Sequence, residues 1–204
     1  MSKIERRNFV ADELRVSKDG ETRKIEGHAA VFNQLSEDLG FFKEKIAPGA
    51  FKNANKQDVR ALFNHDPNFV LGRNTAGTLK MEEDKTGLKV QIDPPDTSFA
   101  RDLSVSIDRG DISQMSFGFR VVKESWDKGK DGALDTRTLE EVDLFDVSPV
   151  TFPAYPQTDV GVRSLSEISE SRKEFFKESE PEKKPGKMEL NKRKQKQAEY
   201  LVNQ

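Results

Sequence analysis

Alternation of apolar and polar residues runs through the first 150 residues and predicts strands more often than helices. Residues 23–34 alternate, and residues 59–66 form a compact apolar run. Residues 68–95 contain short alternating runs separated by turn residues, which predicts a meander of antiparallel strands. Two further strands are predicted at 112–126 and 136–152, joined by a turn rich in Lys, Gly and Asp.

One segment changes this period. Within residues 96–111, apolar residues recur every four positions from Phe99 to Ile107, as on one face of a helix. Asp96 or Thr97 offers an N-cap, and a glycine follows the last apolar position, so both ends of a helix are marked. The pattern as a whole predicts an α+β fold with more strand than helix.

The composition narrows the chemistry. Hydrophobic and charged residues each make up 34% of the 204 residues, and the net charge is -2, which gives no reason to expect a membrane surface or a specific nucleic acid as partner. No apolar run is long enough to span a membrane, and no signal peptide is visible. With no Cys and 2 His, the chain lacks the ligands of thiolate or His-rich metal centres and a cysteine nucleophile. We therefore expect no metal and no cofactor.

The charge is concentrated in the last part of the chain. Residues 164–204 begin acidic and end basic, and EPEKKPGK (180–187) has no apolar residue. Such a composition buries too little surface to offset the entropy of ordering. We expect a body at 1–163 and a flexible or weakly helical tail at 164–204. The tail is either a solvated extension or an interaction and targeting segment.

Only two side chains titrate near neutral pH, and they are the candidate general bases. His28 lies inside an alternating strand, where a satisfied, half-buried histidine is expected, whereas His65 lies at a strand end, where functional groups are common. Ser116 lies in the apolar run MSFGF, so its hydroxyl needs a partner. Gly118 in the same run leaves room for backbone or substrate to approach closely.

An acid completes a candidate triad. If the strands 112–126 and 136–150 pair around a turn centred near residue 130, Ser116 lies roughly opposite residue 144. Asp146 and Glu141 then both lie within one or two ladder steps, and Asp146, an acid in an apolar run, needs a partner. Serine, histidine and acid are the components of a hydrolytic triad, and the spacing leaves both acids open.

Six blocks in a fixed order give the sequence a family resemblance. It resembles the prohead, or capsid-maturation, serine proteases of tailed bacteriophages, which share their fold with the herpesvirus assembly protease. The blocks are GHAAVFNQ (27–34), EKIAPGAF (44–51), ALFNHDPNFVLGR (61–73), GTLKMEEDKTGLKV (77–90), GDISQMSFGFRV (110–121) and EVDLFDVSPVTFPAYP (141–156). The resemblance covers about residues 20–163.

The resemblance implies a fold and a site. The fold would be a mainly antiparallel, barrel-like sheet with a few helices. The histidine of the NHD block, His65, would be the base, and the serine of the SFGF block, Ser116, the nucleophile. The family places an acid, most often glutamate, where this chain has Asp146, which is shorter by one methylene; Glu141 is the reserve. No oxyanion donor is assigned.

The resemblance also implies a substrate and a place of action. The substrate would be the scaffold region of the major capsid protein and the protease itself, cleaved inside the assembling prohead in the host cytoplasm. The herpesvirus relatives suggest a homodimer or higher oligomer. A different class of protein stays open: a catalytically inert scaffold or capsid-assembly protein built on the same fold.

Overall fold

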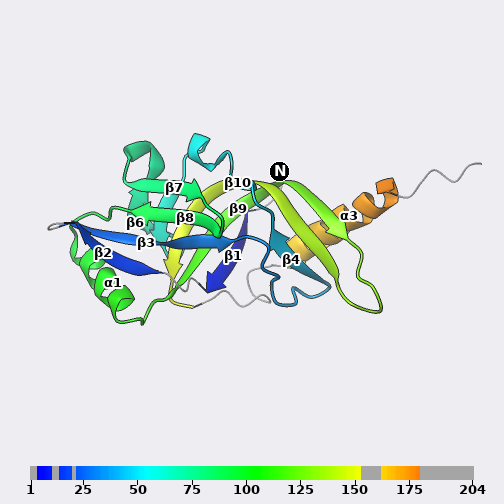
Figure 1. Cartoon of the computed structure of the whole chain (residues 1–204), viewed down its shortest axis with the longest axis horizontal. Helices are drawn as coiled ribbons and strands as arrows, with labels where there is room; N and C mark the ends of the chain where they lie inside the picture. Colours follow the sequence, from blue (N-terminus) through cyan, green and yellow to red (C-terminus); the bar gives the residue numbers. More distant parts are fainter. Residues whose placement is uncertain (1–3, 11–13, 20–21, 153–161, 180–204) are drawn as a thin grey trace, which may run out of the picture. The chain divides into compact units, whose positions relative to one another are not determined.

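Two β-sheets enclose an apolar core and contain nearly half of the described residues (Figure 1). The computed structural model describes residues 4–10, 14–19, 22–152 and 162–179. The fold is α+β, as the sequence predicts, with one mixed sheet, one antiparallel sheet and two α-helices in these ranges.

The larger sheet has six strands and is organised around one long strand. Its members are β1 (Glu5–Val10), β4 (Phe42–Ile46), β5 (Arg60–Phe63), β6 (Asp66–Arg73), β9 (Gln114–Asp127) and β10 (Asp135–Val150). The order is β1-β9-β10-β5-β6, and β4 also pairs with β10. Strand β10 is antiparallel to β9 but parallel to β4 and β5.

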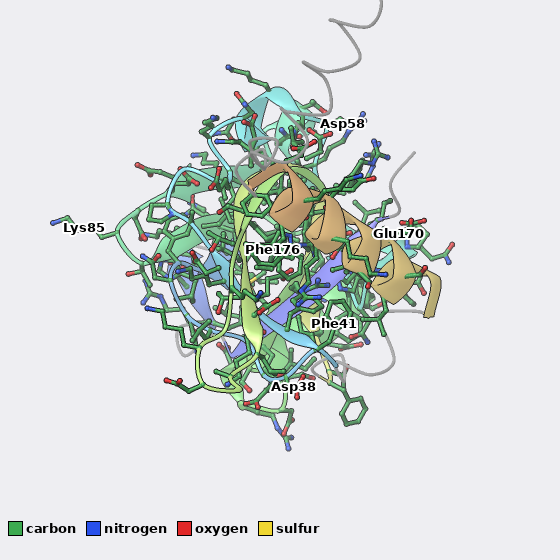
Figure 2. All side chains as sticks on the ribbon, turned by 90° about the vertical axis from the view of Figure 1, so that its right-hand side faces the viewer. Asp38, Phe41, Asp58, Lys85, Glu170 and Phe176 are labelled. Carbon is green, nitrogen blue, oxygen red and sulfur yellow. The ribbon has the colours of Figure 1, made fainter. Side chains whose placement is uncertain are left out.

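The smaller sheet is antiparallel throughout. It contains β2 (Arg15–Asp19), β3 (Thr22–Val31), β7 (Leu79–Glu83) and β8 (Gly87–Ile92), in the order β2-β3-β8-β7. Lys85, in the turn between β7 and β8, projects away from the ribbon (Figure 2). The prediction of one meander over residues 68–95 is therefore partly wrong. Strand β6 pairs with β5 in the larger sheet, and only β7 and β8 form the expected hairpin.

The predicted helix is confirmed as α1 (Ser98–Asp108). Thr97 is its N-cap, and the Thr97 side chain accepts a hydrogen bond from the backbone N–H of Ala100. Gly110, with φ +80°, follows the helix in the left-handed conformation that glycine adopts without steric cost. Two short 3-10 helices, η1 (Ala54–Lys56) and η2 (Asn74–Ala76), lie in the connections.

The second α-helix, α3 (Val162–Ser179), covers the start of the predicted tail. Residues 180–204 lie outside the described residues, so the division into a body at 1–163 and a tail at 164–204 stays a prediction. In the described ranges, no helix is both long and apolar enough to cross a membrane.

The barrel expected from the family is not found among the described residues, although most of the strand pairs there are antiparallel, as expected. There, the two sheets remain separate, and β1 and β6 are the outer strands of the larger one. Closure into a barrel requires such edges to pair with each other. The larger sheet is also mixed, because β4 and β5 return to β10 in the same direction as β10 itself.

Alternation along β9 separates the core from the candidate site. Met115, Phe117 and Phe119 are fully buried in the core between the sheets. Because successive side chains of a strand point to opposite faces, Ser116 and Gly118 face away from that core. The candidate site therefore lies on the other face of the larger sheet.

Candidate active site

A two-residue turn presents His65. In the hairpin of β5 and β6, Phe63 pairs with Asp66, which leaves Asn64 and His65 as the loop. Both loop residues have positive φ, 52° and 58°, as a type I′ turn requires, and Asn and His tolerate this conformation better than most residues. The Asn64 side chain also exchanges hydrogen bonds with Thr151, just beyond β10, at 3.1 and 2.9 Å. The turn is thereby fixed against the end of β10.

The Ser116 hydroxyl contacts the imidazole from β9. Its Oγ lies 2.7 Å from Nε2 of His65 and donates to the carbonyl oxygen of Arg7 at 3.0 Å. Strand β1, which contains Arg7, pairs with β9 directly at Ser116. The serine is fully buried. The expectation that a hydroxyl in so apolar a strand has a partner is met by two groups.

The Asp146 carboxylate contacts the other ring nitrogen. Its Oδ1 lies 2.5 Å from Nδ1 of His65, and Asp146 is buried on β10. The Ser148 hydroxyl, two residues further along β10, donates to the same oxygen at 2.7 Å. Ser116, His65 and Asp146 thus form one continuous chain of contacts, with Nε2 facing a hydroxyl and Nδ1 facing a carboxylate. This arrangement favours the tautomer with the proton on Nδ1.

Gly118 provides the space that the carboxylate occupies. Gly118 pairs with Asp146, and a Cβ built on the glycine would overlap Oδ2 of Asp146 and lie 3.2 Å from its Cγ. The sequence suggests a close approach of backbone or substrate at this glycine. The structure shows that the approaching group is the Asp146 side chain.

The register of the β9–β10 hairpin differs from the predicted one. Ser116 pairs with Ser148, not with residue 144, and Leu144 pairs with Phe119. The prediction assumed an unbroken ladder around residue 130, whereas the pairs nearest the turn, such as Thr136 with Asp127, are centred between residues 131 and 132. The register shift between Leu144 and Asp146 then adds one further position. Asp146 nevertheless lies within two ladder steps of Ser116, as expected.

Glu141, the reserve acid, lies elsewhere. It pairs with Lys123, and its carboxylate contacts Nζ of Lys52 at 3.1 Å and Nδ2 of Asn53 at 2.8 Å. The hydrogen bond from Lys52 lowers the pKa of Glu141. The structure therefore brings Asp146, and not Glu141, to the imidazole of His65.

His28 is paired in the smaller sheet, as expected for a satisfied histidine. Its Nε2 lies 2.9 Å from Oδ2 of Asp84, and the residue is buried. Burial of the Asp84 carboxylate acts to raise its pKa, but the backbone N–H of Gly87, the His28 ring and the backbone N–H of Thr86 hold the pKa at about 2. His28 is thus held in a separate pair with Asp84.

A buried ionic network underlies β1, and sequence patterns did not indicate it. Arg7 contacts Glu44 at 2.6 Å and Glu5 at 2.7 Å, and Arg137 contacts the same two carboxylates at 3.0 Å each. Burial acts to lower the pKa of Arg7, but Glu44 and Glu5 raise it above its usual value. Because Arg7 also contacts Ser116 through its carbonyl oxygen, the network holds β1 beside the candidate nucleophile.

The geometry suits nucleophilic hydrolysis. A hydroxyl within hydrogen-bond reach of an imidazole, itself oriented by a carboxylate, is the arrangement that activates a serine. Ser148 was missed by the sequence reasoning, although it lies in the same block as Asp146. In the described part of the chain, no three acidic or histidine side chains gather as metal ligands would.

The known proteins that this chain is similar to are phage proteases. A family profile described as caudovirus prohead serine protease matches residues 12–174. The prohead protease of Enterobacteria phage HK97 is 31% identical over 159 residues, which cover 75% of this chain and 65% of that protein. The chain thus spans slightly less than two thirds of that relative. The structure of the bacteriophage T4 capsid assembly protease is similar with a TM-score of 0.47 and 13% identity, over 74% of this chain and 98% of that one.

Proposed function

Because the chain belongs to the family of caudovirus prohead serine proteases, we propose that it is a serine endopeptidase of capsid maturation. Ser116 is the nucleophile, His65 the general base, and Asp146 the acid that orients the imidazole. The observation that supports this proposal is the continuous chain of contacts from Ser116 Oγ through the His65 ring to the Asp146 carboxylate.

The proposed reaction proceeds in two stages. The Ser116 hydroxyl donates its one proton to the Arg7 carbonyl oxygen in the free protein, and it turns this proton toward His65 Nε2 for the reaction. Nε2 takes the proton as Oγ attacks the scissile carbonyl carbon, and the imidazolium then protonates the leaving amine. The resulting acyl-enzyme is hydrolysed by a water that His65 activates in the same way. Asp146 holds the proton on Nδ1 and stabilises the imidazolium during both transfers.

Asp146 takes the place of the longer acid that is commoner in the family. The short contact of 2.5 Å with His65, the register shift before Asp146 and the absence of a side chain at Gly118 together offset the missing methylene. Ser148 donates to the same carboxylate oxygen and is a positioning residue in this scheme. Ser116 is fully buried here. A substrate therefore reaches it only when the polypeptide around it, which includes β1, moves to expose the hydroxyl.

The proposed substrate is the scaffold region of the major capsid protein, and in addition the protease itself. The support is the family and the printed name of the HK97 relative, a prohead protease. The site of action would be the assembling prohead in the host cytoplasm. Residues 164–204 would direct encapsidation, be removed by self-cleavage, or both, because a highly charged segment with few apolar residues is an accessible target.

The test is co-expression of the chain with the capsid protein of the same phage, followed by mass spectrometry of the fragments. The wild type should produce discrete capsid-protein fragments, and Ser116→Ala should abolish them while leaving the circular dichroism spectrum unchanged. Asp146→Asn should abolish most cleavage, whereas the matched change Glu141→Gln should not. Intact capsid protein with the wild type would instead favour the inert scaffold protein. Intact masses of the wild type and Ser116→Ala that differ only by the one oxygen atom of the substitution would contradict self-cleavage.

A further inference from the structure

Gln114 lies beside the candidate nucleophile on the same face of the larger sheet. It precedes Ser116 by two residues on β9, so the two side chains point to the same side. It pairs with Val150, two positions along the ladder from the pair of Ser116 and Ser148. At the rise of a strand, two residues correspond to about 7 Å.

The carboxamide oxygen of Gln114 is buried and has no hydrogen-bond partner. Across residues 4–10, 14–19, 22–152 and 162–179, it is the one buried side-chain nitrogen or oxygen that lacks a hydrogen-bond partner. Ser116, His65, Asp146 and Ser148 are all hydrogen-bonded to one another or to backbone. Buried acceptors without a donor are rare in folded proteins. An unpaired acceptor beside a nucleophile indicates a group whose partner arrives with the substrate.

We propose that Gln114 binds the main chain of the substrate: its Oε1 accepts a hydrogen bond from a peptide N–H within two residues of the scissile bond. This inference rests on the proposed peptidase function. In an extended substrate, the peptide N–H two residues from the scissile carbonyl lies about 7 Å from that carbonyl. Gln114 lies about the same distance from Ser116 along β9, so this N–H lies close to Gln114 when the scissile carbonyl lies at Ser116. A neutral acceptor for a peptide N–H requires no particular substrate side chain, so Gln114 fixes the register of the substrate.

The test is a double-mutant cycle between enzyme and substrate. Gln114→Leu keeps the approximate shape of the side chain and removes its hydrogen-bonding capacity. The substrates are a peptide that spans a mapped cleavage site and a set of variants in which one peptide N–H within two residues of the scissile bond is replaced by an ester oxygen. Gln91→Leu, the same change in β8 of the smaller sheet, is the control for the kinetics only, because the Gln91 side chain donates to Glu26 at 2.6 Å in the free protein.

We expect Gln114→Leu to lower kcat/KM for the all-amide peptide about fivefold to tenfold, the size of one hydrogen bond, mainly through KM. One ester peptide should lose a similar factor with the wild type and nothing further with Gln114→Leu. The thermal midpoint of Gln114→Leu should not fall, since the Oε1 that the substitution removes is buried and has no hydrogen-bond partner in the free protein.

Two results would overturn the proposal. The first is unchanged kinetics for Gln114→Leu, as expected if a water satisfies the oxygen. The second is a loss that is the same for every peptide, as expected if Gln114 acts on the oxyanion or on folding. If the wild type cleaves normally, either result contradicts the role of Gln114 but not the proposed peptidase function. If the wild type cleaves no peptide and no capsid protein, the proposed function fails instead.

Discussion

A methyl group at Gly118 should abolish most of the proposed catalytic activity, although it contacts neither Ser116 nor His65 and acts only by displacing Asp146. In Gly118→Ala the new Cβ overlaps Oδ2 of Asp146 and lies 3.2 Å from its Cγ. To regain an ordinary nonbonded separation of about 3.5 Å, the carboxylate has to withdraw by about 1.3 Å. If Oδ1 moves by the same amount, its contact of 2.5 Å with His65 Nδ1 lengthens to about 3.8 Å, which is no longer a hydrogen bond.

We expect the displacement of the carboxylate to lower the rate of peptide cleavage. Loss of the group that orients the base, or a misplacement of about 1 Å, lowers kcat by about 10²-fold to 10⁴-fold, or about 2.7–5.5 kcal/mol of barrier. The assay is cleavage of a peptide that spans a mapped site. Circular dichroism and the thermal midpoint of Gly118→Ala show whether the fold persists.

The control for this prediction is the Asp146→Ala background. There the carboxylate is absent, so adding Gly118→Ala should lower the rate no further. A folded Gly118→Ala protein with wild-type kcat would refute the assignment of Asp146 to His65. Additive losses in the double variant would show that the methyl group acts on something other than the carboxylate.

Two further predictions concern stability. Glu44→Gln removes the charge that two buried arginines share. We therefore expect the free energy of unfolding to fall by about 3–5 kcal/mol and the thermal midpoint by roughly 6–20 °C. Glu37→Gln, a change at an exposed residue, is the control, and equal thermal midpoints for the two variants would refute a stabilising network. Asp84 has a folded-state pKa of about 2, below its usual 3.8, so its contribution is present above about pH 4 and lost as the pH falls toward 2. The midpoint of Asp84→Asn should therefore vary less than that of the wild type over this range, and parallel curves would contradict the assigned pKa.

Local signals predicted the elements that depend on local sequence. The helix α1 follows from its apolar spacing and from the Thr97 cap, which needs only the next three residues. His65 was expected at a strand end, and its turn uses two residue types that tolerate positive φ. Such features are encoded within a few positions of the chain.

Pairing across the chain could not be predicted in the same way. Strand β6 alternates like β7 and β8 but belongs to the other sheet, because alternation specifies a buried face and not a partner. The strand pairs nearest the turn are centred between residues 131 and 132, not at 130, and the register shift before Asp146 adds one more position, so the residue opposite Ser116 is Ser148 and not residue 144. The contact of Arg7 with Ser116 joins residues 109 positions apart, and no local pattern reports it.

The position of β10 in the chain gives the site an order of assembly during synthesis. The polypeptide is made from its N-terminus, so His65 and Ser116 leave the ribosome before Asp146 and Ser148. Strand β10 also joins β4 and β5, made some 90 residues earlier, and pairings of such long range form slowly. A nascent chain therefore carries the nucleophile and the base before it carries the residues that orient them, and a chain that ends before β10 never completes the set.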